Sequence, residues 1–158
     1  MSRPRPPVLI QRELLLNEGA PDPEQIERLV AFQRHGHQVL LVAEQPAGWR
    51  PTRRAVDRDL GLQQDMQQRI RRAGAELDGV IYLVTGLFAR KRNRLSEIDQ
   101  LGERYNVSAA DLIFIGRETI LLESFIQCGG KSISVGPASV PGAKKFDSFK
   151  TALESLEG

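Results

Sequence analysis

Short apolar segments alternate with longer amphipathic segments along almost the whole chain. The apolar segments are rich in Val, Ile and Leu, as is typical of strands covered on both faces of a parallel sheet. They span residues 8–10, 38–43, 79–84, 112–115 and 132–135. The amphipathic segments have apolar residues three and four positions apart, which predicts helices. This order predicts an α/β fold, a three-layer, doubly wound parallel sheet of about five strands with right-handed crossovers.

Residue types that begin and end helices mark several boundaries. Asp22 is expected to cap the first helix, with Pro23 at its first position and Gln25 completing a capping box. Gly36 is expected to end it. The apolar residues expected on its buried face are Ile26, Leu29, Val30 and Phe32. Further helices are expected at about residues 52–73, 95–105 and 118–128, and a last one is expected to be capped by Asp147.

The 158-residue chain has the length and composition of one globular domain. We expect residues 1–7 to form a flexible segment and residues 8–158 to form a single domain. The one cysteine, Cys128, excludes an intrachain disulfide, and no apolar run approaches the roughly 20 residues of a membrane span. We therefore expect a soluble, cytoplasmic monomer or small homo-oligomer.

Five short segments at or near the predicted strands form a set of motifs. They read Gln-Arg-Glu-Leu-Leu-Leu-Asn at 11–17, Leu-Leu-Val-Ala-Glu-Gln at 40–45, Leu-Asp-Gly-Val-Ile-Tyr at 77–82, Arg-Lys at 90–91 and Gly-Arg-Glu-Thr-Ile-Leu at 116–121. In this order they resemble the motifs of the haloacid dehalogenase (HAD) superfamily, and most closely its capless heptose-bisphosphate and histidinol phosphatases. The resemblance covers about residues 8–135 and implies a HAD-like sheet without a large cap domain.

The residues that carry phosphoryl transfer in that family are replaced in this chain. The resemblance places Gln11 at the nucleophilic Asp and Glu13 at the Asp that acts as acid and base. Ala43 stands at a hydroxyl residue that holds phosphate, Lys91 at a phosphate-binding Lys, and Arg117 at a magnesium-binding Asp. A neutral amide is a very poor nucleophile, and Mg²⁺ requires hard oxygen ligands. We therefore expect neither a metal nor another cofactor.

The replaced motifs predict a catalytically inactive phosphatase homologue. Such a domain would work by binding a protein partner or a small phosphorylated or otherwise anionic ligand. The alternative is a residual phosphatase that acts on a small phosphorylated metabolite, such as a sugar phosphate or histidinol phosphate. In that alternative Mg²⁺ is the cofactor, Glu13 remains as the acid or base, and Lys91 holds the phosphate.

Two arrangements of the remaining cations are open. In the first, Arg12, Lys91 and Arg117 converge near the former phosphate and metal positions and hold an anion without metal. In the second, Arg117 pairs with Glu13 or Glu44 and fills the site.

Other cations gather around the second predicted helix and in a run at residues 90–94. Those around the helix are Arg50, Arg53, Arg54, Arg58, Arg69, Arg71 and Arg72. Asp57, Asp59 and Asp65 are interleaved with them, and no aromatic platform for base stacking accompanies the basic run. We interpret both groups as solvated surface and do not expect a nucleic-acid ligand.

Overall fold

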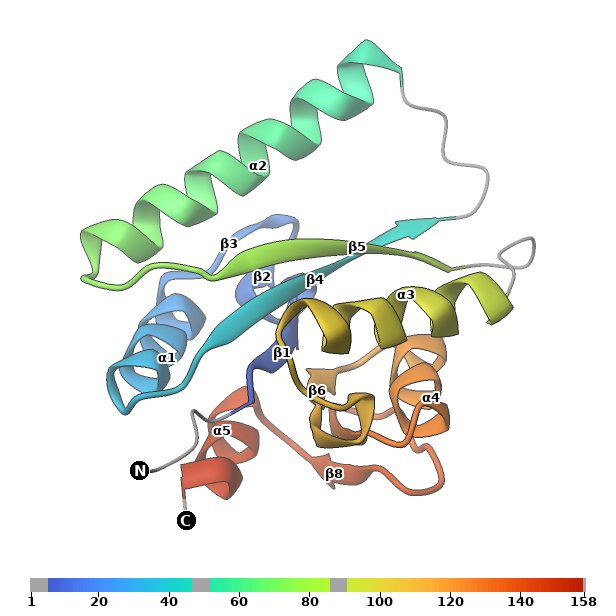
Figure 1. Cartoon of the computed structure of the whole chain (residues 1–158). Coiled ribbons are helices and arrows are strands. Elements are labelled where there is room, and N and C mark those ends of the chain that lie inside the picture. The colour runs from blue at the N-terminus through green and yellow to red at the C-terminus, as the bar shows by residue number, and fades with distance from the viewer. Residues whose placement is uncertain (1–5, 47–51, 86–90, 158) are drawn as a thin grey trace.

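The computed structural model describes residues 6–46, 52–85 and 91–157 (Figure 1). Only the backbone is described for residues 45–46, 84–85 and 91–92. Apart from its last two residues, the segment 1–7 that was expected to be flexible lies outside the described residues.

A six-stranded sheet in the order β5-β4-β1-β6-β7-β8 forms the centre of the molecule, and every neighbouring pair in it is parallel. Its strands are β1 (Val8–Gln11), β4 (Val39–Pro46), β5 (Gly79–Thr85), β6 (Ile113–Gly116), β7 (Lys131–Val135) and β8 (Lys144–Phe146). The five predicted strands are all present, so the α/β prediction is confirmed. The sixth, β8, was missed because this edge strand exposes Lys144 and Lys145 and so has no apolar pattern.

Helices cover both faces of the sheet and form the outer two layers (Figure 1). They are α1 (Pro23–Arg34), α2 (Arg53–Arg72), α3 (Lys91–Arg104), α4 (Thr119–Gln127) and α5 (Phe149–Glu157). The first, second and fifth contribute to one hydrophobic cluster, and the third and fourth contribute to the other. None of the helices in the described ranges combines the length and apolarity needed to cross a membrane.

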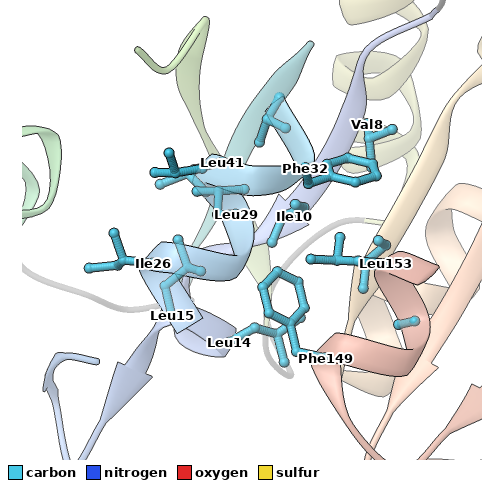
Figure 2. Packing of buried hydrophobic residues seen from close by; sticks show 14 of the residues in the cluster. Val8, Ile10, Leu14, Leu15, Ile26, Leu29, Phe32, Leu41, Phe149 and Leu153 are labelled. Atoms are coloured by element: carbon cyan, nitrogen blue, oxygen red, sulfur yellow. The ribbon is translucent and has the colours of Figure 1, made fainter. Parts of the chain in front are cut away.

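The central strand β1 is buried on both sides, and its alternating residues divide between the two clusters. Val8 and Ile10 point into the first cluster, where Figure 2 shows them beside Phe32 of α1 and Leu153 of α5. Leu9 points into the second cluster. Burying one such side chain contributes roughly 1.5–3 kcal/mol, so the two faces together hold β1 in the middle of the sheet.

The N-terminus of α1 confirms the predicted cap but not the capping box. The Asp22 carboxylate accepts a hydrogen bond from the Glu24 N–H at 3.0 Å, as expected of an N-cap. The Asp22 N–H donates to the Leu15 carbonyl, so it is not available to Gln25, which accepts from Arg28 instead. All four apolar residues predicted for the buried face of α1 are buried.

Two other helix starts differ from the prediction. Asp147 was expected to cap α5, but the hydroxyl of Ser148 lies directly before the helix and accepts from the Thr151 N–H at 3.2 Å. The third helix begins at Lys91 and not at about residue 95, because the apolar stripe that marks it starts one turn inside the helix.

Strand β1 is followed by a helical turn and a hairpin that were not predicted. The turn, η1, spans Arg12–Leu15, and the hairpin pairs β2 (Leu16–Asn17) with β3 (Ala20–Pro21). Glu18 and Gly19 connect the two strands with positive φ angles of 52° and 79°, as a tight hairpin requires. Leu14 and Leu15 of η1 are buried. They anchor the turn, and so hold Glu13 at the carboxyl edge of the sheet.

Gly116 at the end of β6 is expected to tolerate no side chain. A Cβ atom there would lie 2.5 Å from Cζ of Phe114 and 2.8 Å from Oε1 of Gln11, and both of those side chains are buried. We predict that Gly116→Ala lowers the free energy of unfolding in urea by about 1–3 kcal/mol. Gly61→Ala is the matched control, because nothing lies within 4 Å of a Cβ there. In helix α2 it should raise stability by up to about 1 kcal/mol, and equal effects of the two substitutions would contradict the prediction.

Candidate functional site

The order of the strands places a candidate site at the carboxyl end of β1. The chain passes from β1 to β4 and β5 on one side, then crosses to β6, β7 and β8 on the other. The strand order therefore reverses at β1, and ligands of doubly wound sheets bind at the carboxyl ends of the strands at such a point. Gln11 ends β1, Ala43 and Glu44 lie near the end of β4, and Arg117 and Glu118 follow β6.

The side chain of Gln11 joins the end of β1 to the start of α4. It is fully buried, and its Oε1 accepts hydrogen bonds from the N–H groups of Arg117 at 2.8 Å and Glu118 at 3.1 Å. Gly116 permits this contact, since a Cβ atom there would collide with the same oxygen. The Nε2 group of Gln11 has no partner within the described part of the chain. The amide at this position is thus a structural acceptor whose oxygen is already occupied.

Arg117 and Glu13 form an ion pair across the edge of the sheet. Nη2 and Nε of Arg117 donate to Oε2 of Glu13 at 2.8 and 3.2 Å. Their side chains are 53% and 40% exposed, so this pair contributes less than about 1 kcal/mol to stability. This is one of the two arrangements that the sequence left open, and it gives Arg117 a carboxylate partner.

Three carboxylates lie around this edge. Burial raises the pKa of Glu118, the nearby Glu44 carboxylate raises it further, and Glu13 adds a smaller effect in the same direction. The guanidinium of Arg117 acts in the opposite sense but does not cancel them. Ala43 is buried and contributes no polar group to the site. Among the described side chains, the edge therefore carries more negative than positive charge.

Arg12 is directed toward helix α2. Its Nη2 donates to Asp59 at 2.6 Å and its Nη1 donates to Gln63 at 3.1 Å, while the guanidinium lies 5.8 Å from the centre of the Tyr82 ring. The side chain is only 10% exposed, and a buried cation without a counter-charge would cost several kcal/mol. Both terminal nitrogens of Arg12 are thus held by α2.

Arg12, Lys91 and Arg117 were predicted to converge on an anion, and that site stays a prediction. In the structure Arg12 lies against α2. Its burial requires a charge partner, and Asp59 supplies one from α2. Arg117 already pairs with Glu13. Lys91 begins α3, but its side chain lies outside the described residues.

The sequence reasoning missed Asp59, Gln63 and Tyr82 as neighbours of the site. Asp59 accepts from Tyr82 Oη at 2.7 Å as well as from Arg12. A signal was present, because Asp59 and Gln63 continue the helical spacing of the buried residues Met66 and Ile70. Polar residues on the core side of a helix indicate a buried polar partner.

Solved structures match the fold of this chain over nearly its whole length. A D,D-heptose 1,7-bisphosphate phosphatase from B. bronchiseptica, complexed with magnesium and phosphate, matches with a TM-score of 0.75 and 14% identity over 96% of this chain and 98% of that one. The D,D-heptose 1,7-bisphosphate phosphatase from Burkholderia thailandensis matches with a TM-score of 0.61 and 15% identity, covering 96% and 97% of the two chains. A HAD-like protein from Mesorhizobium loti matches with a TM-score of 0.66 and 13% identity, covering 99% and 88%.

This chain has the fold of the HAD phosphatases. The resemblance is thereby confirmed at the level of the fold, and no large cap domain is present in the described residues. No family model matches the chain, and no curated protein matches it in sequence. At these identities the likeness extends to the HAD fold and not to its chemistry, which has to be argued from the site.

The described side chains at this site of the HAD fold are a poor set of ligands for Mg²⁺. The ion needs several oxygen ligands in near-octahedral geometry. The amide oxygen of Gln11 already accepts two N–H groups, and the carboxylate of Glu13 is paired with Arg117. A guanidinium at Arg117 would also repel a divalent cation. The donors present therefore do not fit the ion that this fold implies.

The bond between Arg12 and Asp59 should contribute measurably to stability. Burial alone would raise the pKa of Asp59, but the hydrogen bonds from Arg12 and Tyr82 outweigh it and lower the pKa below the ordinary value of 3.8. We predict that Asp59→Ala lowers the free energy of unfolding by about 2–4 kcal/mol at pH 7, since it leaves the buried guanidinium of Arg12 without its counter-charge.

Asp65→Ala is the matched control, because Asp65 forms an exposed ion pair with Arg69 on the same helix. It should change stability by no more than about 0.5 kcal/mol.

The stabilisation by Asp59 is present above its unfolded pKa and is lost as the pH falls through its folded pKa. The difference between wild type and Asp59→Ala in urea unfolding should therefore shrink below pH 3.8, and a difference independent of pH would contradict this origin.

Glu118 should have the opposite pH dependence. Its pKa is raised above 4.5, so the folded protein binds a proton more tightly than the unfolded chain, and stability falls as the pH rises through the folded pKa. We predict that Glu118→Gln unfolds at higher urea than wild type at pH 7, by a few tenths of a kcal/mol after solvent screening, but not at pH 4. Glu123→Gln, on the exposed side of α4, should show no such pH-dependent gain. A loss of stability at pH 7 in Glu118→Gln would contradict the prediction.

Proposed function

We propose that this chain is a noncatalytic domain with the HAD phosphatase fold that works by binding a protein partner. The observation that carries the proposal is the state of Gln11. Its amide stands at the end of the central strand, where the resemblance places the nucleophile, and its oxygen is occupied by two backbone N–H groups. An amide oxygen that is buried and doubly hydrogen-bonded is unsuited to attack phosphorus.

The charge around the site supports the same conclusion. Phosphoryl transfer depends on cations that neutralise the transferring group. Arg117 is paired with Glu13, and Arg12 is held by Asp59. A phosphate ester would also meet the carboxylate of Glu118, and like charges repel. A small anionic ligand is therefore less well supported than a protein partner.

The alternative is a residual phosphatase for a small phosphorylated metabolite. It is supported by the solved neighbours, which include heptose-bisphosphate phosphatases. Glu13 would then act as acid or base and Lys91 would bind the phosphate, with Mg²⁺ as cofactor. This alternative needs a nucleophile other than Gln11 and requires Glu13 to leave its pair with Arg117. We therefore place it second.

The test is phosphate release by the purified protein. The substrates are sugar phosphates, sugar bisphosphates and histidinol phosphate, each with and without Mg²⁺, and the heptose-bisphosphate phosphatase from Burkholderia thailandensis serves as the active control. We predict no release by this chain above the buffer rate. Turnover that depends on Mg²⁺ and disappears in Glu13→Ala would overturn the proposal and favour the phosphatase.

A gain-of-function variant tests whether the missing carboxylate at position 11 explains a lack of phosphate release. Gln11→Asp restores a carboxylate at the end of β1, and Gln11→Asn is its neutral control of the same size. Phosphate release in Gln11→Asp alone would identify the missing nucleophile as the cause of inactivity. Equal release by wild type and both variants would mean that the activity does not use this position.

A further inference from the structure

Helix α2 extends well beyond the part of it that packs on the core. Its buried residues are Gln63, Met66 and Ile70, all in the second half, and none of residues 53–61 is buried. At 1.5 Å per residue, the helix continues for about 15 Å before its first buried side chain. Figure 1 shows α2 diverging from the sheet toward its N-terminal end. Asp59, held by Arg12 and Tyr82, fastens this half of the helix to the rest of the fold.

The projecting half carries three cations that form no ion pair with the described residues. Arg53, Arg54 and Arg58 are exposed and have no ion pair or side-chain hydrogen bond among the described residues. In the other half of the helix, Arg69 pairs with Asp65, and Arg71 pairs with Glu76 beyond the helix end. Arg72 at the end of the helix also has no ion pair among the described residues, but the three arginines of the first half lie together where α2 buries no side chain.

These cations oppose the stability of their own helix. The N-terminus of a helix carries partial positive charge, so arginines in the first turn are unfavourable, and the first turn of α2 contains no acidic residue. Arg54 and Arg58 are four positions apart and repel each other on the helix surface. Thr52 caps this end of the helix by accepting from the Ala55 N–H at 3.2 Å, but no ion pair among the described residues offsets the repulsion between the arginines.

An exposed apolar strip accompanies the arginines. Leu60 is 51% exposed, and Val56 is partly exposed one turn earlier on the same side of the helix. Leu60 is one of two large hydrophobic residues with such exposure among the described residues. An apolar strip flanked by unpaired arginines is complementary to a segment that carries both carboxylates and an apolar side chain.

We propose that the N-terminal half of α2, from Arg53 to Leu60, binds an acidic, amphipathic segment of a protein partner. The proposal gives the binding domain described above its class of partner and rests on that function. A nucleic acid fits less well, because α2 has no aromatic residue on which a base could stack. The exposed side chain of Leu60 would be buried on binding only if the partner carries an apolar side chain at this point.

The binding test uses a fluorescent synthetic peptide of glutamates with a leucine at every fourth position, measured by anisotropy against the full chain. We expect a dissociation constant below about 100 µM for wild type. The triple variant Arg53→Ala, Arg54→Ala, Arg58→Ala should bind at least about tenfold more weakly. The triple variant Arg72→Ala, Arg104→Ala, Lys145→Ala removes the same charge elsewhere and should bind within about twofold of wild type.

Two further measurements separate recognition from charge alone and from misfolding. Leu60→Ala should weaken the leucine peptide about threefold or more and leave an alanine version of the peptide unaffected. Arg53→Glu, Arg54→Glu should lose binding while its melting temperature rises by about one to three degrees, because acids suit the helix N-terminus. A gain in stability with loss of binding excludes unfolding as the cause.

The outcomes against the proposal are equally specific. No binding of the peptide to wild type, or equal loss in the two triple variants, would overturn it. Tighter binding of a thymidine oligonucleotide, or of phosphatidylserine vesicles, than of the peptide would overturn it in favour of that other anion. None of these readouts depends on phosphate release, so failure here is distinguishable from failure of the noncatalytic function.

Discussion

The hydrogen bonds from the start of α4 to the side chain of Gln11 hold the candidate site together. They join the central strand β1 to the loop after β6 at the point where the strand order reverses. Gly116 is required there because the amide oxygen occupies the space of a Cβ atom. The proposed function rests on the same contact, since an oxygen that accepts from two backbone N–H groups is poorly placed to bind a phosphorus atom or a metal. In the proposed function, the side chain that holds this edge of the sheet together thus also stands in place of a nucleophile.

Two arginines near the site are also held by other side chains of the protein, each through an ion pair with a carboxylate. Arg12 is buried beneath α2, and the carboxylate of Asp59 offsets the cost of its charge. Arg117 lies at the surface, where its pair with Glu13 contributes little stability but neutralises both groups. Arg53, Arg54 and Arg58, on the projecting half of α2, have no ion pair among the described residues.

Much of the fold could be predicted from the sequence. Strands buried on both faces must be apolar, and the helices between them must have one apolar side, so β1 and the buried face of α1 were readable from residue types. The edge strand β8 was not readable, because Lys144 and Lys145 carry no burial signal. The capping box at Gln25 failed since the Asp22 N–H bonds to a residue that precedes the helix. The capping box is thus a case in which a contact with another part of the chain overrides the local pattern.

The sequence by itself determined which chemical groups stand at the end of each strand: an amide at Gln11, a methyl group at Ala43 and a cation at Arg117. Only the tertiary structure decided their partners. Arg12 meets Asp59 across 47 positions, and Arg117 meets Glu13 across 104. Local sequence cannot specify such pairs, because charge partners are chosen by where the folded chain brings carboxylates within hydrogen-bond distance and by how deeply each cation is buried.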